Sequence, residues 1–338
     1  MSVLSRGLSA PLRFRFPLLI VLAAAGFASV AVCAAIGPVS IPFGEVFRDL
    51  LRPAAAHGVF SQILFQIRVP RILLGFLVGG SLAAAGAGLQ GALRNPLADP
   101  YIVGTSSGAA LGAAICFMAG LDRLHLVPIF AFVGAILSIL AVLALSRRGG
   151  KFPVATVLLA GVVVGAFVWS LVTFLLTLTG ENLQKIIFWL MGSLADRSWG
   201  DVTMMLPYAL AGCAALILLA RPLNLLTLGE ERAESLGLHP EKAKLAVLAS
   251  ASLLTAASVA VSGLIGFVGL VVPHAVRIVS GPDHRALIPA SFLAGGILIV
   301  WSDTLARLLF QPAELPVGVV TALLGAPFFL YLLRKANS

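Results

Sequence analysis

Long runs of uncharged, apolar residues recur along the whole chain. Residues 72–93 contain no Asp, Glu, Lys or Arg, and neither do residues 100–121. A helix needs about 20 apolar residues to cross the hydrocarbon core of a bilayer. Only 11% of the residues are charged, whereas a soluble domain carries about 25%. The sequence therefore predicts an all-α integral membrane protein.

The apolar runs divide into about ten predicted spans. Residues 245–276 are too many for one span, because at about 1.5 Å per residue they would extend roughly 48 Å across a core of about 30 Å. We divide this run near Ser262 and Gly263. The predicted spans are 17–36, 70–92, 97–118, 126–145, 153–176, 202–220, 244–262, 264–280, 286–305 and 316–333. Together they form one predicted domain, residues 1–338.

The distribution of basic residues predicts the orientation of these spans. Most Lys and Arg residues fall in the inner loops if the N-terminus lies inside, so the positive-inside rule predicts that both termini are cytoplasmic. The first hydrophobic segment also fits a signal peptide, since Arg13 and Arg15 precede it and small residues surround Cys33. Its removal would leave nine spans and invert the orientation.

Several kinds of chemistry are missing from the sequence. No phosphate-binding loop is present, so we expect no ATP site of that type. No His, Cys, Asp and Glu residues have metal-ligand spacing, and we predict no metal, no other cofactor and no catalysis. The net charge of +9 is explained by inner loops and does not indicate nucleic acid. Asp303 is the only acid well inside a predicted span, four residues before Arg307, so the two can pair on one helix face.

Two long blocks of sequence carry a resemblance to a known family. The first begins at Arg68 and reads RVPRILLGFLVGGSLAAAGAGLQGALRNPLADPYIVGTSSGAALGA. The second begins at Gly263 and reads GLIGFVGLVVPHAVR, and SDTLAR and ELPVGVVTALLGAPFF follow it. In these blocks the chain resembles the FecCD-type permeases of bacterial type II ABC importers, from about residue 60 to the C-terminus.

The resemblance implies a function and a set of partners. Such permeases have ten helices and pair with a second copy of themselves in the bacterial inner membrane. Separate ATPase subunits and a periplasmic or lipid-anchored substrate-binding protein complete the importer. We expect an ATP-driven importer of an iron chelate, either a siderophore or heme, with vitamin B12 as the alternative substrate. A secondary transporter driven by an ion gradient is the competing hypothesis, but it would need buried carboxylates near the bilayer midplane.

Three arginines are candidates for contact with the binding protein. Arg68 and Arg71 match the R-x-P-R motif of the family, and Arg307 matches a further arginine near the last outer loop. The resemblance implies that these residues receive acidic side chains of the binding protein. Arginine suits this role because it stays charged and offers a forked set of donors to a carboxylate. The alternatives are anchoring to lipid headgroups and an internal pair with Asp303.

The inner loops contain the remaining candidate residues. The resemblance implies that Asn95 and Leu97 form a cytoplasmic gate, with Thr156 at a second gate segment. Residues 229–237 combine helix-forming residues, bounding glycines and acids at the start, which indicates a short helix outside the membrane. The resemblance places the coupling helices that contact the ATPase at about 228–240. Their predicted contact residues are Glu230, Glu231, Arg232, Ala233, Glu234, Ser235, Leu236 and Gly237.

Overall fold

Residues 15–51, 58–180 and 182–336 are described by a computed structural model, in which they contain helices and no strand. His57, in the first predicted outer loop, lies outside these ranges. The long helices are α1 (Arg15–Ala35), α4 (Val69–Ala92), α5 (Thr105–Met118), α6 (Val127–Ser146), α7 (Val154–Leu178), α9 (Trp199–Leu218), α12 (Pro240–Ser262), α13 (Val268–Ser280), α14 (His284–Leu308) and α15 (Val317–Ala336). The short helices are α2 (Phe43–Leu51), α3 (Val59–Gln62), α8 (Leu183–Leu190), α10 (Ala220–Leu226) and α11 (Glu230–Ser235).

The long helices confirm the all-α membrane fold. Within the described residues, seven helices are long and apolar enough to cross a bilayer, and α5, α13 and α15 are shorter apolar helices. Each of the ten predicted spans coincides with one of these helices. One boundary difference is at α5, which begins at Thr105 instead of residue 97. A loop and the short 3₁₀ helix η4 (Pro100–Val103) occupy the intervening residues.

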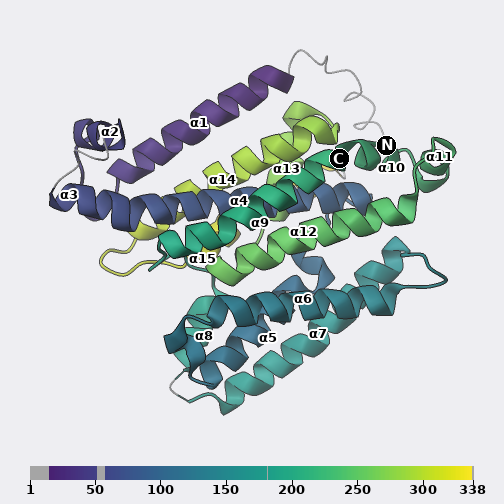
Figure 1. Cartoon of the computed structure of the whole chain (residues 1–338), viewed down its shortest axis with the longest axis horizontal. Coiled ribbons are helices and arrows are strands. Elements are labelled where there is room, and N and C mark those ends of the chain that lie inside the picture. The colour runs from purple at the N-terminus through teal and green to yellow at the C-terminus, as the bar shows by residue number, and fades with distance from the viewer. Residues whose placement is uncertain (1–14, 52–57, 181, 337–338) are drawn as a thin grey trace.

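Helix α4 is the centre of the fold. It is surrounded by α1, α9, α12, α13 and α14 (Figure 1). Of the most apolar 18 residues in the continuous segment Val59–Ala92, 83% are buried inside the subunit. Its many small residues allow this, because helix backbones pack closely in lipid only where side chains are small. A Cβ at Gly86 would overlap the Gly269 carbonyl oxygen of α13, and one at Gly79 would overlap the Gly295 carbonyl oxygen of α14.

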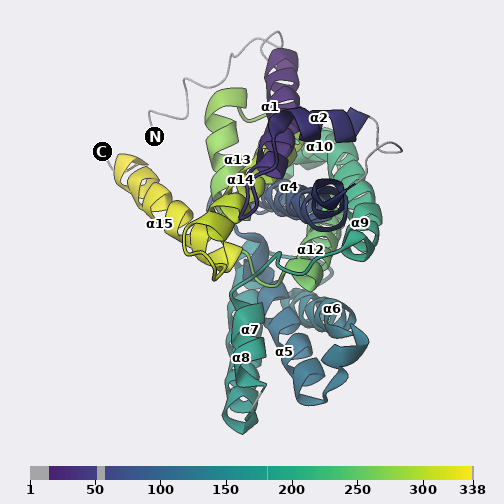
Figure 2. The ribbon, with the colours of Figure 1, turned by 90° about the vertical axis from the view of Figure 1, so that its left-hand side faces the viewer.

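Helices α5 to α8 form a second group beside the group around α4. Figure 1 shows them below α12, and α12 contacts both α5 and α6. Helix α7 also packs on η4, at the point where a Cβ on Gly161 would overlap the Ile102 carbonyl oxygen. Helix α15 projects from the other side of the molecule and contacts α13 and α14 (Figure 2). Much of the surface of α7 and α15 is therefore not covered by the rest of the chain.

The predicted break at Ser262 and Gly263 is confirmed. Helix α12 ends at Ser262, Gly263 has φ +68°, and α13 begins only at Val268. Non-helical backbone at membrane depth needs hydrogen-bond partners from the protein. The Tyr101 hydroxyl supplies them, because it accepts from the Ile265 N–H and donates to the Ile265 carbonyl, both at 3.0 Å.

The helix that contains the R-x-P-R motif starts earlier than predicted. Helix α3, the π-helix η3 (Ile63–Arg68) and α4 form one continuous apolar segment from Val59. The sequence predicts a start at Pro70, because proline lacks an N–H and usually opens a helix. Here the Val69 N–H reaches back to the Leu64 carbonyl in a π-turn, which carries the helix through the proline. Arg68 and Arg71 therefore lie inside a helix and not at its mouth.

Candidate functional site

Arg71 is the centre of a buried charge cluster near the start of α4. Its Nη2 lies 2.8 Å from Asp303 Oδ1 and its Nε lies 3.0 Å from Asp303 Oδ2, which is a forked pair with α14. Its Nη1 lies 2.8 Å from Oε2 of Glu314, in the connection between α14 and α15. Arg71 thereby ties three segments together. We call the end of the molecule that contains this cluster the arginine end; it is on the left in Figure 1.

Arg68 is also buried, and its partners are backbone carbonyls. Its Nη1 donates to the carbonyl oxygens of Ala34 at 2.7 Å and Ala35 at 3.0 Å, and its Nη2 donates to that of Val39. Ala34 and Ala35 are the last residues of α1. The last carbonyls of a helix have no partners inside the helix, and a cation is favourable there. Arg68 therefore caps α1.

Arg307 completes the arginine end. Its Nε lies 3.3 Å from Oδ2 of Asp303, four residues earlier on α14, so the predicted pair on one helix face is confirmed. Its Nη2 also donates to Thr304 at 3.1 Å. All three predicted docking arginines are buried within the subunit. The predicted contact with a binding protein is not tested by this arrangement and stays a prediction.

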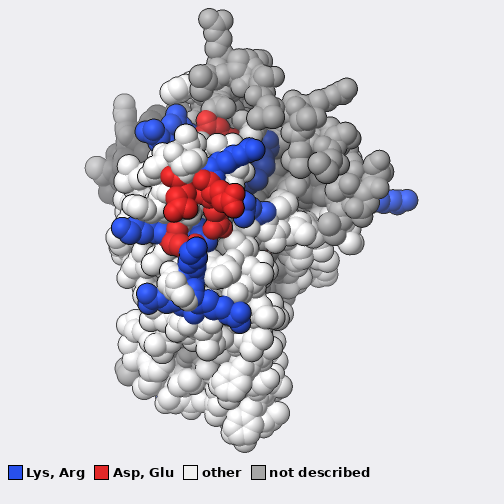
Figure 3. Space-filling model, turned by 90° about the vertical axis from the view of Figure 1, so that its right-hand side faces the viewer, with Lys and Arg blue, Asp and Glu red and all other residues white. Residues whose placement is uncertain are grey.

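The opposite end of the molecule contains α10 and α11. As predicted, a short helix lies between Gly229 and Gly237, both with positive φ. Ala233 is fully buried and joins Leu226 and Ala243 in a small apolar cluster, so α11 is seated on α10 and α12. Figure 3 looks at this end, where acidic side chains gather and Lys and Arg side chains surround them. We call it the α11 end.

Lys244 of α12 connects α11 to the connection between α6 and α7. Its Nζ lies 2.6 Å from Glu241 Oε1, 3.3 Å from both carboxylate oxygens of Glu230, and 3.1 Å from the Phe152 carbonyl oxygen. The second oxygen of Glu241 accepts from the Phe152 N–H at 2.6 Å. Glu230 also pairs with Arg94 at 3.7 Å. Five residues from four segments thus form one polar cluster, which we call the Lys244 cluster.

The predicted gate residues lie next to this cluster. Asn95 forms a turn in which its Oδ1 accepts from the Leu97 N–H at 2.9 Å, and the Leu97 side chain is exposed. Thr156 is half-buried in the first turn of α7. Within the described ranges, no hydrogen bond or ion pair joins Thr156 to Asn95 or Leu97. Their two segments are linked through Arg94, Glu230, Lys244 and Phe152, and α7 also packs on η4, which follows Leu97.

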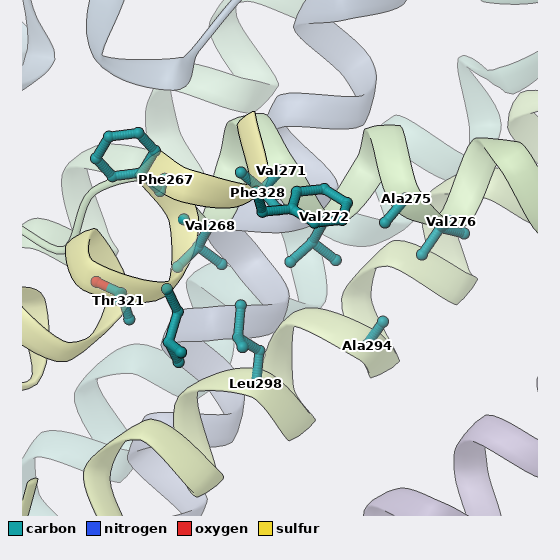
Figure 4. A pocket seen from close by; sticks show the side chains of 12 residues that line it. Phe267, Val268, Val271, Val272, Ala275, Val276, Ala294, Leu298, Thr321 and Phe328 are labelled. Carbon is teal, nitrogen blue, oxygen red and sulfur yellow. The ribbon is translucent and has the colours of Figure 1, made fainter. Parts of the chain in front are cut away.

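An apolar pocket lies between α13, α14 and α15. Its volume is about 380 Å³ and Thr321 is the only hydroxyl-bearing residue that lines it. Phe267, Leu298 and Phe328 line it from three different segments (Figure 4). Phe267 has φ +69°, a conformation that bulky residues rarely adopt. The lining carries no charged group, and the Thr321 hydroxyl donates to the Gly318 carbonyl oxygen at 3.0 Å.

Sequence reasoning missed Glu314, Lys244 and Glu241, three residues of the two clusters. Glu314 belongs to the ELP stretch that carries the resemblance, but nothing local marks it as the partner of Arg71. Lys244 looks like an ordinary basic residue at the inner mouth of a span, where lysines are common. The only available signal was its position three residues after Glu241, which allows an ion pair where both lie on one helix. The predicted span began only at residue 244, whereas α12 begins at Pro240. Among the described residues, no group of three His, Cys, Asp or Glu side chains could hold a metal ion.

Comparison with known proteins relates this architecture to transport subunits. A family model described as the FecCD transport family matches residues 19–335. The chain is 48% identical to the cobalamin import system permease protein BtuC of Halobacterium salinarum, over 80% of this chain and 73% of that protein. It is 40% identical to the hemin transport system permease protein HmuU of Yersinia pestis, over 88% and 90% of the two chains. With the Fe(3+) dicitrate permease protein FecD of Escherichia coli the identity is 36%, over 94% and 97%.

Solved structures agree with these relatives. An inward-facing structure assigned to the metal-chelate type of ABC transporter has a TM-score of 0.83 and 32% identity, and the match covers 94% of this chain and 99% of that one. The PsaBC structure from Streptococcus pneumoniae has a TM-score of 0.53 and 16% identity, which is a likeness of fold alone.

Proposed function

This chain belongs to the FecCD transport family, and from that membership we propose that it is the permease subunit of an ATP-driven importer. The observation that carries the proposal is the match of residues 19–335, nearly the whole chain, to a family whose relatives include named import permeases. ATP hydrolysis then belongs to separate ATPase subunits, and a substrate-binding protein delivers the cargo.

The proposed cargo is a metal held in an organic chelate. We infer an iron chelate, a siderophore or heme, and the hemin and ferric dicitrate relatives support this class. Cobalamin is the second candidate, because the Halobacterium salinarum relative at 48% identity is a cobalamin permease. These cargoes are all large, and selection among them is expected to reside in the binding protein.

Helix α7 is the proposed wall of the translocation pathway. Only 17% of the most apolar 18 residues of α7 are buried, so most of the helix surface faces away from the rest of the subunit. Its exposed hydroxyls are satisfied internally: Ser170 donates to the Ala166 carbonyl and Thr173 to the Trp169 carbonyl, both at 3.0 Å. A wall without free polar groups binds a large chelate weakly and lets it leave. A second copy of the chain would close the pathway from the other side.

The proposed importer lies in a cytoplasmic membrane, with α11 inside and the arginine end outside. In this arrangement α11 and its flanking residues, about 228–240, contact the ATPase. Arg68, Arg71 and Arg307 face the binding protein. Because all three arginines are buried, the binding protein cannot contact them freely. It would reach Arg71 at the position of Glu314, the exposed partner of Arg71. Charged groups at such a rim act mainly on the association rate and on orientation.

Uptake by reconstituted vesicles tests the proposal. Proteoliposomes would contain this chain, its ATPase and its binding protein, with radiolabelled ferric siderophore, hemin, ferric citrate or cyanocobalamin outside. ATP-dependent accumulation of one probe is the expected result, and it also identifies the cargo. Accumulation without ATP, or by this chain alone under an ion gradient, would contradict the proposal. Vesicles with the chain but without the ATPase are the matched control.

A further inference from the structure

The Lys244 cluster joins the segments that a coupled transporter has to move together. Glu230 opens α11, Phe152 lies just before α7, and Arg94 lies just after α4. Lys244 contacts the first two directly, and Glu230 passes the contact on to Arg94. No other residue of the cluster contacts both α11 and the α6–α7 connection.

The burial of Lys244 makes this junction stiff. The Lys244 side chain is 2% exposed, whereas those of Glu230 and Glu241 are 36% and 26% exposed. Water can reach the two carboxylates but not the ammonium group. A buried ammonium without partners is strongly unfavourable. Movement of Glu230 or Phe152 away from Lys244 would leave the ammonium with fewer partners, Glu241 among them, and is therefore unfavourable. A displacement of α11 is thus resisted by the α6–α7 connection.

Both predicted gate segments begin at this junction. Arg94 directly precedes Asn95, and Phe152 lies four residues before Thr156. The Phe152 peptide is held from both sides, since Glu241 accepts from its N–H and Lys244 donates to its carbonyl. These contacts restrict the movement of α11 relative to the two segments that carry Asn95, Leu97 and Thr156.

We propose that Lys244 is a positioning residue that couples α11 to the α6–α7 connection and so to the gate segment that carries Thr156, while Glu230 links α11 directly to Arg94. This inference rests on the proposed function and deepens it, because it names the contact through which ATP-driven movement of α11 reaches the pathway. A simpler explanation is that Lys244 only keeps α11 folded, although Ala233 already seats α11 through apolar contacts. The two explanations differ in what happens to transport when ATP hydrolysis continues.

The test measures uptake and phosphate release in the same proteoliposomes of the complete importer. Lys244→Met removes the junction and keeps the volume of the side chain. Glu230→Gln weakens the links to Lys244 and Arg94 but leaves those between Lys244, Glu241 and Phe152. Lys242→Met is the matched control, because Lys242 lies on the same helix, two residues away, and is exposed. Cyanocobalamin, hemin and ferric citrate serve as probes.

We expect the number of probe molecules imported per ATP to fall at least about fivefold in K244M, with phosphate release within about twofold of wild type. The same ratio should fall in E230Q whatever its rate of phosphate release, because Glu230 is also a predicted ATPase contact. K242M should keep the wild-type ratio. The ratio should fall further in the double variant K244M/E230Q than in K244M, because E230Q also weakens the pair between Glu230 and Arg94.

The inference would be overturned if an assembled K244M complex imported as many probe molecules per ATP as the wild type. If K244M does not assemble, E230Q decides by the same ratio. The wild-type vesicles separate the two proposals. ATP-independent wild-type uptake would overturn both the proposed function and the coupling role. ATP-dependent wild-type uptake with an unchanged ratio in the variants would overturn the coupling role alone.

Discussion

A buried cation lies at each end of this helix bundle, but the two cations have different partners. Arg71, at the arginine end, makes a forked pair with Asp303, whose side chain is only 4% exposed, and Arg307 shares the same carboxylate. Lys244, at the α11 end, pairs with two carboxylates that water can reach. The first cluster is enclosed by the helices that form the core. The second joins short connecting segments at the surface.

This difference predicts different consequences of breaking the two clusters. Removal of one partner from a buried pair leaves an uncompensated charge, which costs stability. Removal of a buried lysine whose partners are partly hydrated leaves no buried charge behind. The arginine end should therefore respond mainly in stability, and the α11 end mainly in the coupling of transport to ATP hydrolysis.

The largest effect is expected for Asp303→Asn. The variant leaves Arg71 with Glu314 alone and Arg307 without its carboxylate, so we expect a loss of about 3–5 kcal/mol of unfolding free energy. The measurement is the thermal unfolding midpoint of the purified protein in detergent. Lys244→Met should lose only about 1–2 kcal/mol in the same assay, as for the loss of ordinary polar contacts. Equal losses in the two variants would remove the distinction between the two ends.

Arg68→Met should come next in size. The change leaves the carbonyls of Ala34, Ala35 and Val39 without their donor, and hydrogen bonds from charged groups contribute about 1.5–3 kcal/mol each. We expect a net loss of about 3 kcal/mol and earlier proteolytic cleavage near the end of α1. The control is Arg48→Met, because the Arg48 side chain is largely exposed. A midpoint equal to that of wild type would show that Arg68 does not hold α1.

Glu314→Gln should have a smaller effect on stability. Arg71 keeps its forked pair with Asp303, and Glu314 is accessible to water, so we expect a loss of about 1 kcal/mol or less. If Arg71 docks a carboxylate of the binding protein, this variant removes the negative charge that competes for its Nη1, and the association rate of the binding protein should rise. Surface plasmon resonance at low and moderate salt measures this rate. A fall in the rate would argue against access to Arg71 through Glu314.

The smallest effect is expected at an exposed reference pair. Lys185 Nζ lies 2.7 Å from Oδ2 of Asp122, and the ammonium group lowers the pKa of this carboxyl below its ordinary value of 3.8. Stability from a depressed carboxyl pKa is present above the unfolded pKa and is lost as pH falls through the folded one. We expect at most about 1 kcal/mol, lost below about pH 4, as for exposed ion pairs. The wild type and Asp122→Asn should differ above that pH and converge below it. A difference that persists in acid would contradict the assignment.

Much of the fold could be predicted because it follows from local patterns. The length and apolarity of each run define a span, and Gly263 marks the break between α12 and α13. Gly229 and Gly237 mark the limits of α11 in the same way. The start of the R-x-P-R helix could not be predicted, because a π-turn carries the helix through Pro70. Pro70 would otherwise be taken as the helix start, and the turn has no sequence signature.

The partners of the charged residues could be predicted only within a helical turn. Asp303 and Arg307 are four residues apart on α14, and their pair was expected. Arg71 and Glu314 are 243 positions apart, and Lys244 and Phe152 are 92 positions apart. No local period relates such residues. Their contacts exist because α4 packs against α14, and α12 packs against α6.

The sequence by itself determined that this chain is a helical membrane protein of the FecCD family, with a short helix between Gly229 and Gly237. These features depend on hydropathy, glycine positions and long matching motifs, all of which are read along the chain. Only the tertiary structure decided that the three arginines are buried inside the subunit, and that Lys244 joins α11 to the α6–α7 connection. The physical reason is that burial and ion pairing depend on which helices are neighbours, and that neighbourhood is set by packing across the whole bundle.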